Sequence, residues 1–150
     1  MKHAIDKRTY ATAALQLEEM MAAAGGKRGK DTEQDCPVNH SFGDGCYIRE
    51  WSSPAGMLVV SKIHKVAHPF FVLEGDVSVI TESGVERIKA PHYGITQPGT
   101  KRVLYTHEPT VWVTVHVTES RDVDEIEKEI ICTDINDMCL DDIKIEELQP

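Results

Sequence analysis

The sequence predicts an all-β core, an antiparallel β-sandwich or small barrel, with a helix before it and an acidic segment after it. Between residues 45 and 118, short runs rich in β-branched and aromatic residues alternate with turn residues, and no helix-length pattern interrupts them. The last run has period two: valines at the odd positions 111 to 117 alternate with Trp112, Thr114 and His116. Such a strand has two different faces. The expected strands cover residues 46–51, 57–65, 70–73, 77–81, 85–89, 101–106 and 111–118.

The segments on either side of this core have helical composition. Residues 9–24 are rich in strong helix formers, with Thr9 as the expected N-cap and Gly25-Gly26 as the end of the helix. Residues 25–39 are polar, glycine-rich and without a period, which is typical of a linker. Residues 122–131 combine helical spacing with an acidic first turn, and residues 135–150 fit either a strand or a helix.

The length of 150 residues matches one domain with appendages. We therefore expect an N-terminal helix and linker over residues 1–44, a β-sandwich over residues 45–118, and an acidic helix and tail over residues 119–150.

Charge is distributed unevenly along the chain. Residues 1–118 carry 13 basic and 13 acidic residues, whereas residues 119–150 carry 3 and 12 and account for the whole net charge of −9. An acidic tail disfavours nucleic acid, and no apolar run approaches the ~18 residues of a membrane helix. No signal peptide is visible, and Cys36, Cys46, Cys132 and Cys139 form no CxxC pair. We therefore expect a cytoplasmic protein with reduced thiols and with neither nucleic acid nor membrane among its partners.

Two segments resemble the signature motifs of the cupin superfamily. The first is HKVAHPFFVLEGD, residues 64–76, where histidines lead into an aromatic and aliphatic strand that ends in a Glu-Gly turn. The second is PHYGITQPGTKR, residues 91–102, with a glycine, a short strand and a Pro-Gly turn. The resemblance covers about half the chain, residues 45–118. It implies a cupin jelly roll, a double-stranded β-helix whose open end holds a small-molecule or metal site. It also implies a homodimer, with residues 9–24 crossing to the partner or covering the sheet.

Aligned on the Glu-Gly turn, the chain departs from the ligand pattern that this resemblance implies. Lys62 stands in place of the first histidine of the first motif, His64 matches the second, and His68 takes the place of the glutamate. Arg102 occupies the histidine position of the second motif. Cationic side chains repel a divalent metal and attract a carboxylate or phosphate. If the alignment holds, these four side chains converge inside the cup around a small anion, with Tyr105 as a further ligand contact.

Two functions stay open at this point. The first is a binding module that senses or sequesters a small anionic ligand through Lys62, Arg102 and Tyr105. The second is a cupin enzyme, either a metal-dependent dioxygenase or an isomerase or epimerase of nucleotide-linked sugars. In that enzyme His64 and His68 act as metal ligands or as an acid–base pair.

A divalent transition metal would require a third donor besides His64 and His68. His116 lies at the polar-face phase of its strand, and His92 lies just before Gly94 in the second motif. These two histidines are the candidates, and His116 completes the metal set that we predict.

Overall fold

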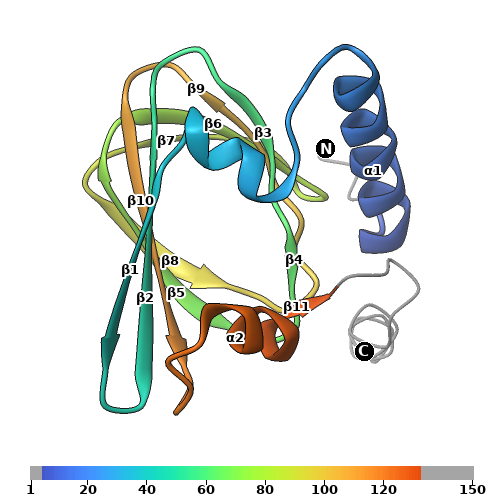
Figure 1. Cartoon of the computed structure of the whole chain (residues 1–150). Coiled ribbons are helices and arrows are strands. Elements are labelled where there is room, and N and C mark those ends of the chain that lie inside the picture. Colours follow the sequence, from blue (N-terminus) through green and yellow to red (C-terminus); the bar gives the residue numbers. More distant parts are fainter. Residues whose placement is uncertain (1–4, 133–150) are drawn as a thin grey trace.

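The structure, a computed structural model, describes residues 5–132, which form two β-sheets that face each other as a jelly roll (Figure 1). The five-stranded sheet has the order β1-β2-β10-β5-β8, and the four-stranded sheet has the order β3-β9-β6-β7. Within these sheets, neighbouring strands pair antiparallel. The jelly-roll core predicted from the sequence is confirmed.

The strands of the larger sheet are β1 (Val38–Gly43), β2 (Cys46–Ser53), β10 (Thr110–Val117), β5 (His68–Glu74) and β8 (His92–Thr96). Those of the smaller sheet are β3 (Leu58–Val60), β9 (Val103–Thr106), β6 (Asp76–Thr81) and β7 (Gly84–Lys89). Two further short strands, β4 (Ile63–His64) and β11 (Ile131–Cys132), pair with each other.

Strand β10 has the two faces that its period of two predicts. Its even-numbered residues, from Thr110 to His116, are buried, whereas its valines are partly or fully exposed. β10 lies between β2 and β5 in the larger sheet, so its buried side chains line the centre of that sheet's inner face. Because the side-chain period of a strand is two, one inward residue fixes the inward phase of the whole strand.

Side chains from the inner faces of both sheets fill the hydrophobic core between them. The buried members are Cys36, Trp51, Phe70, Val72, Val77, Val79, Ile88, Leu104 and Trp112. Gly75 lies between β5 and β6 with φ +113°, and a Cβ there would come within 2.9 Å of the Cα of Thr110. Only glycine fits this close approach of two chain segments.

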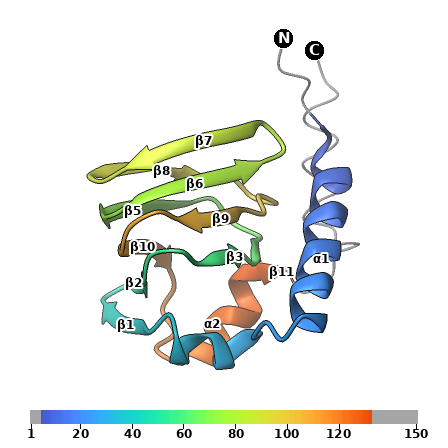
Figure 2. The same ribbon diagram turned by 90° about the horizontal axis from the view of Figure 1, so that it is seen from above.

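Helix α1 (Lys7–Ala23) packs on the outer face of the smaller sheet (Figure 2). Tyr10 and Ala14 contact Val103 of β9, and the Tyr10 hydroxyl donates to the carbonyl of Ile80 at 2.7 Å. The helix begins earlier than residue 9, because the Asp6 carboxylate, and not Thr9, caps it. Within the chain, this helix covers part of the smaller sheet.

Helix α2 (Val123–Ile130) occupies the position predicted for the second helix. The Asp122 carboxylate accepts hydrogen bonds from the two backbone N–H groups of Asp124 and Glu125, as an N-cap does. Ile126 and Ile130 pack against Tyr47 of β2, so this helix closes one end of the jelly roll. Neither α1 nor α2 is long and apolar enough to cross a membrane.

Three elements differ from the expectation. The sheet begins at Val38, inside the segment assigned to the linker, which also holds the 3₁₀ helix η1 (Gly29–Gln34). β1 is an edge strand whose side chains are mostly exposed, so it carries little hydrophobic signal. The run 57–65 is interrupted between β3 and β4. The acidic tail, with its open choice of strand or helix over residues 135–150, lies outside the described residues.

Candidate metal centre

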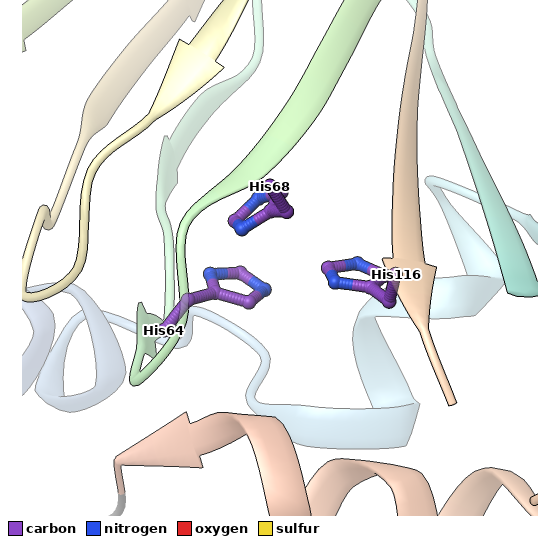
Figure 3. A group of neighbouring side chains, drawn as sticks. All are labelled: His64, His68 and His116. Atoms are coloured by element: carbon purple, nitrogen blue, oxygen red, sulfur yellow. The ribbon is translucent and has the colours of Figure 1, made fainter. Parts of the chain in front are cut away.

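Three histidine side chains from separate segments point toward one another inside the jelly roll (Figure 3). His64 lies on β4, His68 at the start of β5, and His116 near the end of β10. One ligand nitrogen from each lies within 4.8 Å of the other two. The ring centroids are 4.3 Å apart for His64 and His68, 5.4 Å for His64 and His116, and 4.6 Å for His68 and His116. We call these three residues the histidine triad.

Strand phase and strand pairing place each member of the triad. His116 has the inward phase of β10, and His68 is the buried first residue of β5. His64 is held differently, because its strand is only two residues long. β4 pairs with β11, and the neighbouring Lys65 N–H donates to the carbonyl of Ile130 at 2.7 Å. The end of α2 therefore fixes His64 beside the other two members of the triad.

Burial keeps the imidazoles of the triad neutral. Burial, followed by the nearby His68 and His116, lowers the pKa of His64 from 6.5 to about 2. Burial also lowers the pKa of His116 to about 4, and it lowers the pKa of His68. An imidazole cation in low dielectric is costly, and each additional cation nearby raises that cost. At neutral pH all three rings carry a lone pair that a metal can bind.

Two hydrogen bonds orient the rings for metal binding. The carbonyl of Val66 accepts from His68 Nδ1 at 3.1 Å, and because a carbonyl only accepts, the lone pair of His68 is on Nε2. His116 Nε2 lies 2.9 Å from the Thr114 hydroxyl, which leaves Nδ1 for a metal when Nε2 donates. Metal-bound histidines generally donate their other N–H in this way.

The triad fits the donor requirement of a divalent transition metal. Imidazole nitrogen suits zinc, copper, iron and nickel. Two nitrogens bound tetrahedrally to one zinc ion lie ~3.3 Å apart, so small side-chain rotations would bring the triad from 4.8 Å or less to binding distance. Three protein ligands leave at least one coordination position open.

A second layer of inward side chains lies between the triad and the hydrophobic core. Thr114 is two residues from His116 on β10, and it pairs with Arg49 of β2 on one side and Phe70 of β5 on the other. Residues paired across a sheet point to the same face, so Arg49 and Phe70 also face the interior. One step further in, Trp112 belongs to the core cluster.

Arg102 reaches this second layer from the opposite sheet. It immediately precedes β9, and its guanidinium carbon lies 5.0 Å from the centroid of the Phe70 ring and 5.7 Å from that of Trp112. Burial lowers the pKa of Arg102, although a guanidinium stays charged at neutral pH. The charges of Glu82 and Glu86 act on it from a distance. Within residues 5–132 its guanidinium makes neither an ion pair nor a hydrogen bond.

Two further groups near the triad lack a polar partner among the described residues. The charge of Arg49 contributes to lowering the pKa values of His64 and His116, which places it close to both, and its guanidinium makes no ion pair or hydrogen bond there. Thr96 of β8 pairs with His68, is 1% exposed, and has a hydroxyl without a hydrogen-bond partner. An unpartnered buried polar atom is costly. A ligand or water atom would satisfy both groups.

Tyr47 separates the triad from α2. Its ring stacks on His116 at a centroid distance of 5.7 Å, and its hydroxyl is 2.6 Å from Nδ1 of His40. Burial raises the pKa of Tyr47 to about 12, so the phenol stays protonated. With Ile126 and Ile130 behind it, this ring shields the triad from water.

Two of the predicted ligand contacts lie away from the triad. Lys62 is in the break between β3 and β4, its side chain is 52% exposed, and it pairs with Glu127 of α2 at 3.4 Å. The expectation that it shares a face with His64 on one strand is therefore wrong. Tyr105 has the outward phase of β9, is 42% exposed, and meets His107 edge-on. It is not a ligand contact inside the cup.

The other predicted residues lie inside the jelly roll. His64, His68 and His116 come together as the metal prediction requires, and Arg102 lies near them. His92 is not in the triad; its ring is 5.9 Å from Phe70. Arg49 was missed, although its position two residues before Trp51 on a predicted strand was a usable signal of the inward phase.

Comparisons with known proteins identify the fold. No protein-family model matches the chain, and no curated protein sequence matches it. Among solved structures, the DMSP lyase DddQ from Ruegeria pomeroyi DSS-3 is similar at 15% identity and a TM-score of 0.53, covering 67% of this chain and 55% of DddQ. Salicylate 1,2-dioxygenase from Pseudoaminobacter salicylatoxidans, in adducts with gentisate, is similar at 11% identity and a TM-score of 0.53, covering 84% of this chain and 36% of the enzyme.

The cupin domain of Cnp3 from Schizosaccharomyces pombe matches at 19% identity and a TM-score of 0.47, covering 61% of this chain and 68% of that domain. The chain spans about half the length of DddQ and about a third of the dioxygenase. The jelly roll of this chain is similar in fold to DddQ and to salicylate 1,2-dioxygenase, and its two sequence motifs resemble those of the cupin superfamily.

Proposed function

We propose that this protein is a metal-dependent cupin enzyme that acts on a small anionic substrate. A divalent transition metal is held by His64, His68 and His116, and the substrate's negative charge is held by Arg49 and Arg102. The convergence of three buried, neutral imidazoles is the observation that carries this proposal.

The number of protein ligands favours catalysis over a purely structural metal. Structural zinc sites usually have four protein ligands, whereas catalytic sites have three and keep a position for water or substrate. The similar structures include two enzymes, a lyase and a dioxygenase, which supports this choice by analogy of fold only.

The positive charges of Arg49 and Arg102 in the second layer favour an anionic substrate. Arg49 and Arg102 face the interior without a carboxylate partner among the described residues, in a protein whose net charge is −9. Guanidinium groups bind carboxylates through paired, charge-assisted hydrogen bonds, which are stronger than neutral ones. A substrate carboxylate there would also be attracted to a metal at the triad. The guanidinium of Arg102 lies over the rings of Phe70 and Trp112, and these cation–π contacts help to hold it in place.

Each protein group then has a defined task. A bound metal would supply Lewis acidity at its open position. Arg102 and Arg49 orient the substrate, the Thr96 hydroxyl offers a hydrogen bond beside His68, and Tyr47 excludes water on the side of α2. Preorganised charges of this kind are effective because the site is buried.

A binding module that senses or sequesters the anion is the second candidate. One observation favours it: the inward positions of β2, β5 and β10 next to the triad carry no carboxylate. If a metal occupies the three histidines, no ordinary acid–base group is left there for proton transfer.

Isothermal titration of the chelated, untagged protein with Zn²⁺ tests the metal. We expect one ion per chain, and we expect His64→Ala and His116→Ala each to weaken binding by at least ~100-fold, since each removes one of three ligands. His107→Ala is the matched control, because His107 bonds to Ser78 outside the jelly roll. Binding unchanged in the triad variants would contradict the proposal.

The Co²⁺-loaded protein tests the anion site and separates the two candidates. Acetate and benzoate, used as probes, should perturb the Co²⁺ absorption bands, and Arg102→Gln should weaken this effect by ~10–100-fold, the range for one charged hydrogen bond. Turnover of small carboxylates by the Fe²⁺- or Mn²⁺-loaded protein supports the enzyme. Tight anion binding without turnover across such a panel supports the module.

A further inference from the structure

Strand register on the inner face of the five-stranded sheet fixes where Arg49 stands relative to the triad. The row nearest the open end holds Tyr47 paired with His116, and His68 paired with Thr96. The next row runs across four strands, and its successive partners are Arg49, Thr114, Phe70 and Gly94. Arg49 therefore enters the interior from β2, two strands away from Phe70 on β5.

Arg102 enters the same interior from the opposite sheet and at a different place. Its guanidinium carbon lies 5.0 Å from the ring centroid of Phe70 and 5.7 Å from that of Trp112, so it lies over β5 and β10 and not over β2. Neighbouring strands are ~4.8 Å apart, so one to two strand spacings, ~5–10 Å, separate the Arg102 guanidinium sideways from the Arg49 backbone. The two cations are thus two separate sites for negative charge.

The two positive charges act on different members of the triad. Arg49 and Arg102 both contribute to the lowered pKa of His64. Arg49 also contributes to the lowered pKa of His116, whereas Arg102 contributes to that of His68. This difference agrees with the strand positions, because His116 lies next to β2 and His68 is on β5. The triad therefore faces the space between the two arginines.

The surroundings of the two arginines supply little negative charge. Neither the row of the triad nor the row of Arg49 contains a carboxylate. Glu82 and Glu86 act on Arg102 from a distance, but Glu82 pairs with Lys7 at 3.7 Å, and Glu86 is exposed on the edge strand β7. Buried cations are costly unless anions neutralise them. Three neutral imidazoles would also leave the charge of a bound divalent metal uncompensated, which increases the demand for a dianion.

The spacing of the cations indicates how the charges of that dianion are arranged. A carboxylate binds one guanidinium most strongly when both of its oxygens accept hydrogen bonds from it. Two guanidinium groups at separate places are therefore best matched by two separate carboxylates. A phosphate monoester concentrates about two negative charges on a single group, which matches one cationic site and leaves the other unpaired.

We infer that the anion bound in this cup is a small dicarboxylate, with one carboxylate held by Arg102 and the other by Arg49, so that the carbon chain between them passes the histidine triad. This inference rests on the proposed function and names its substrate class. It assigns to Arg49 a specific task, which is to select molecules that have a second carboxylate.

Isothermal titration of the Zn²⁺-loaded protein with matched probes tests this selection. Succinate and butyrate have the same number of carbon atoms, but butyrate lacks the second carboxylate. Malonate and glutarate vary the distance between the two carboxylates, and methyl phosphate is the probe with both charges on one group. We expect the best dicarboxylate to bind at least ~10-fold more tightly than butyrate, because one charged hydrogen bond contributes a factor of ~10–100. It should also bind more tightly than methyl phosphate.

Variants of the two arginines assign the second carboxylate to its partner. Arg49→Gln should weaken binding of the best dicarboxylate by ~10–100-fold and leave the affinity for butyrate unchanged, whereas Arg102→Gln should weaken both. Arg49→Lys keeps the positive charge and should retain part of the preference, which a merely structural role of Arg49 would not predict. Lys62→Gln is the matched control, because this exposed cation pairs with Glu127 outside the cup, and it should change neither affinity.

The outcomes separate this inference from the proposed function. Circular dichroism and the Zn²⁺ stoichiometry should be the same in all variants as in the wild type. Equal affinities for butyrate and every dicarboxylate, a preference that persists in Arg49→Gln, or tightest binding of methyl phosphate would each overturn the dicarboxylate inference while leaving the anion site in place. If the protein binds no Zn²⁺, or if no probe binds the loaded protein, the proposed function fails and the inference fails with it.

Discussion

Acidification of the metal-free protein should lower its free energy of unfolding, because the buried triad resists protonation. His64 has a pKa of about 2 in the folded chain against 6.5 for an ordinary histidine, and His116 has a pKa of about 4. Below pH 6.5 the unfolded chain takes up protons that the folded chain refuses, so stability falls as the pH falls. His116 contributes to this loss of stability between pH 6.5 and about 4, and His64 contributes between pH 6.5 and about 2.

The magnitude follows from the width of this window. Each pH unit below 6.5 costs ~1.4 kcal/mol per histidine kept neutral, so at about pH 5 each of the two contributes a loss of ~2 kcal/mol. Urea unfolding of the chelated protein at about pH 7 and about pH 5 measures this loss. In His64→Gln the loss between these pH values should be ~2 kcal/mol smaller than in the wild type, and in His64→Gln/His116→Gln it should be ~4 kcal/mol smaller. An equal loss in wild type and both variants would refute the claim that these imidazoles are held neutral by burial.

Three further predictions concern the scaffold. Ile126→Ala should lower the free energy of unfolding by ~2–5 kcal/mol in urea titrations, because Ile126 is fully buried against Tyr47 and a cavity remains; a change near zero would contradict the packing of α2. Asp76→Asn should reduce stability at neutral pH, with the difference from wild type shrinking as the pH falls, since Arg87 lowers the pKa of Asp76 and the pair is lost on protonation; a pH-independent difference would count against this. Deleting residues 136–150 should raise the isoelectric point above 5.2 and leave the melting temperature unchanged, measured by focusing and calorimetry; a large drop would assign the tail to the fold.

The sequence predicted the strand-rich core because its signals are local. Period-two alternation over residues 111–117 and turn residues between short β-rich runs depend only on near neighbours along the chain. The same holds for α2, where Asp122 and the spacing of Ile126 and Ile130 are visible in one short stretch. The inward phase of His116 was readable for this reason too, as was the Glu-Gly turn that aligned His64 and His68 with the cupin motif.

Predictions from the local sequence pattern were wrong where a strand is interrupted, or where contacts between distant segments set the direction in which a side chain faces. Lys62 and His64 would face the same side only on one continuous strand. β3 ends and β4 begins on either side of Lys62, so Lys62 lies between the two strands and pairs with Glu127. Tyr105 faces outward because the pairing of β9 with β6 sets its phase. β1 was hidden because an exposed edge strand needs no apolar pattern.

The fold class, the second helix and the three candidate metal-binding histidines were therefore identified from the sequence alone. Which of those residues meet was decided by tertiary structure. His64, His68 and His116 are brought together by pairing β4 with β11 and by the placement of β10 beside β5. Arg49 is placed near them by its pairing with Thr114 on β10. The physical reason is that register between strands far apart in sequence depends on the packing of the whole core, whereas periodicity depends on the geometry of a single strand.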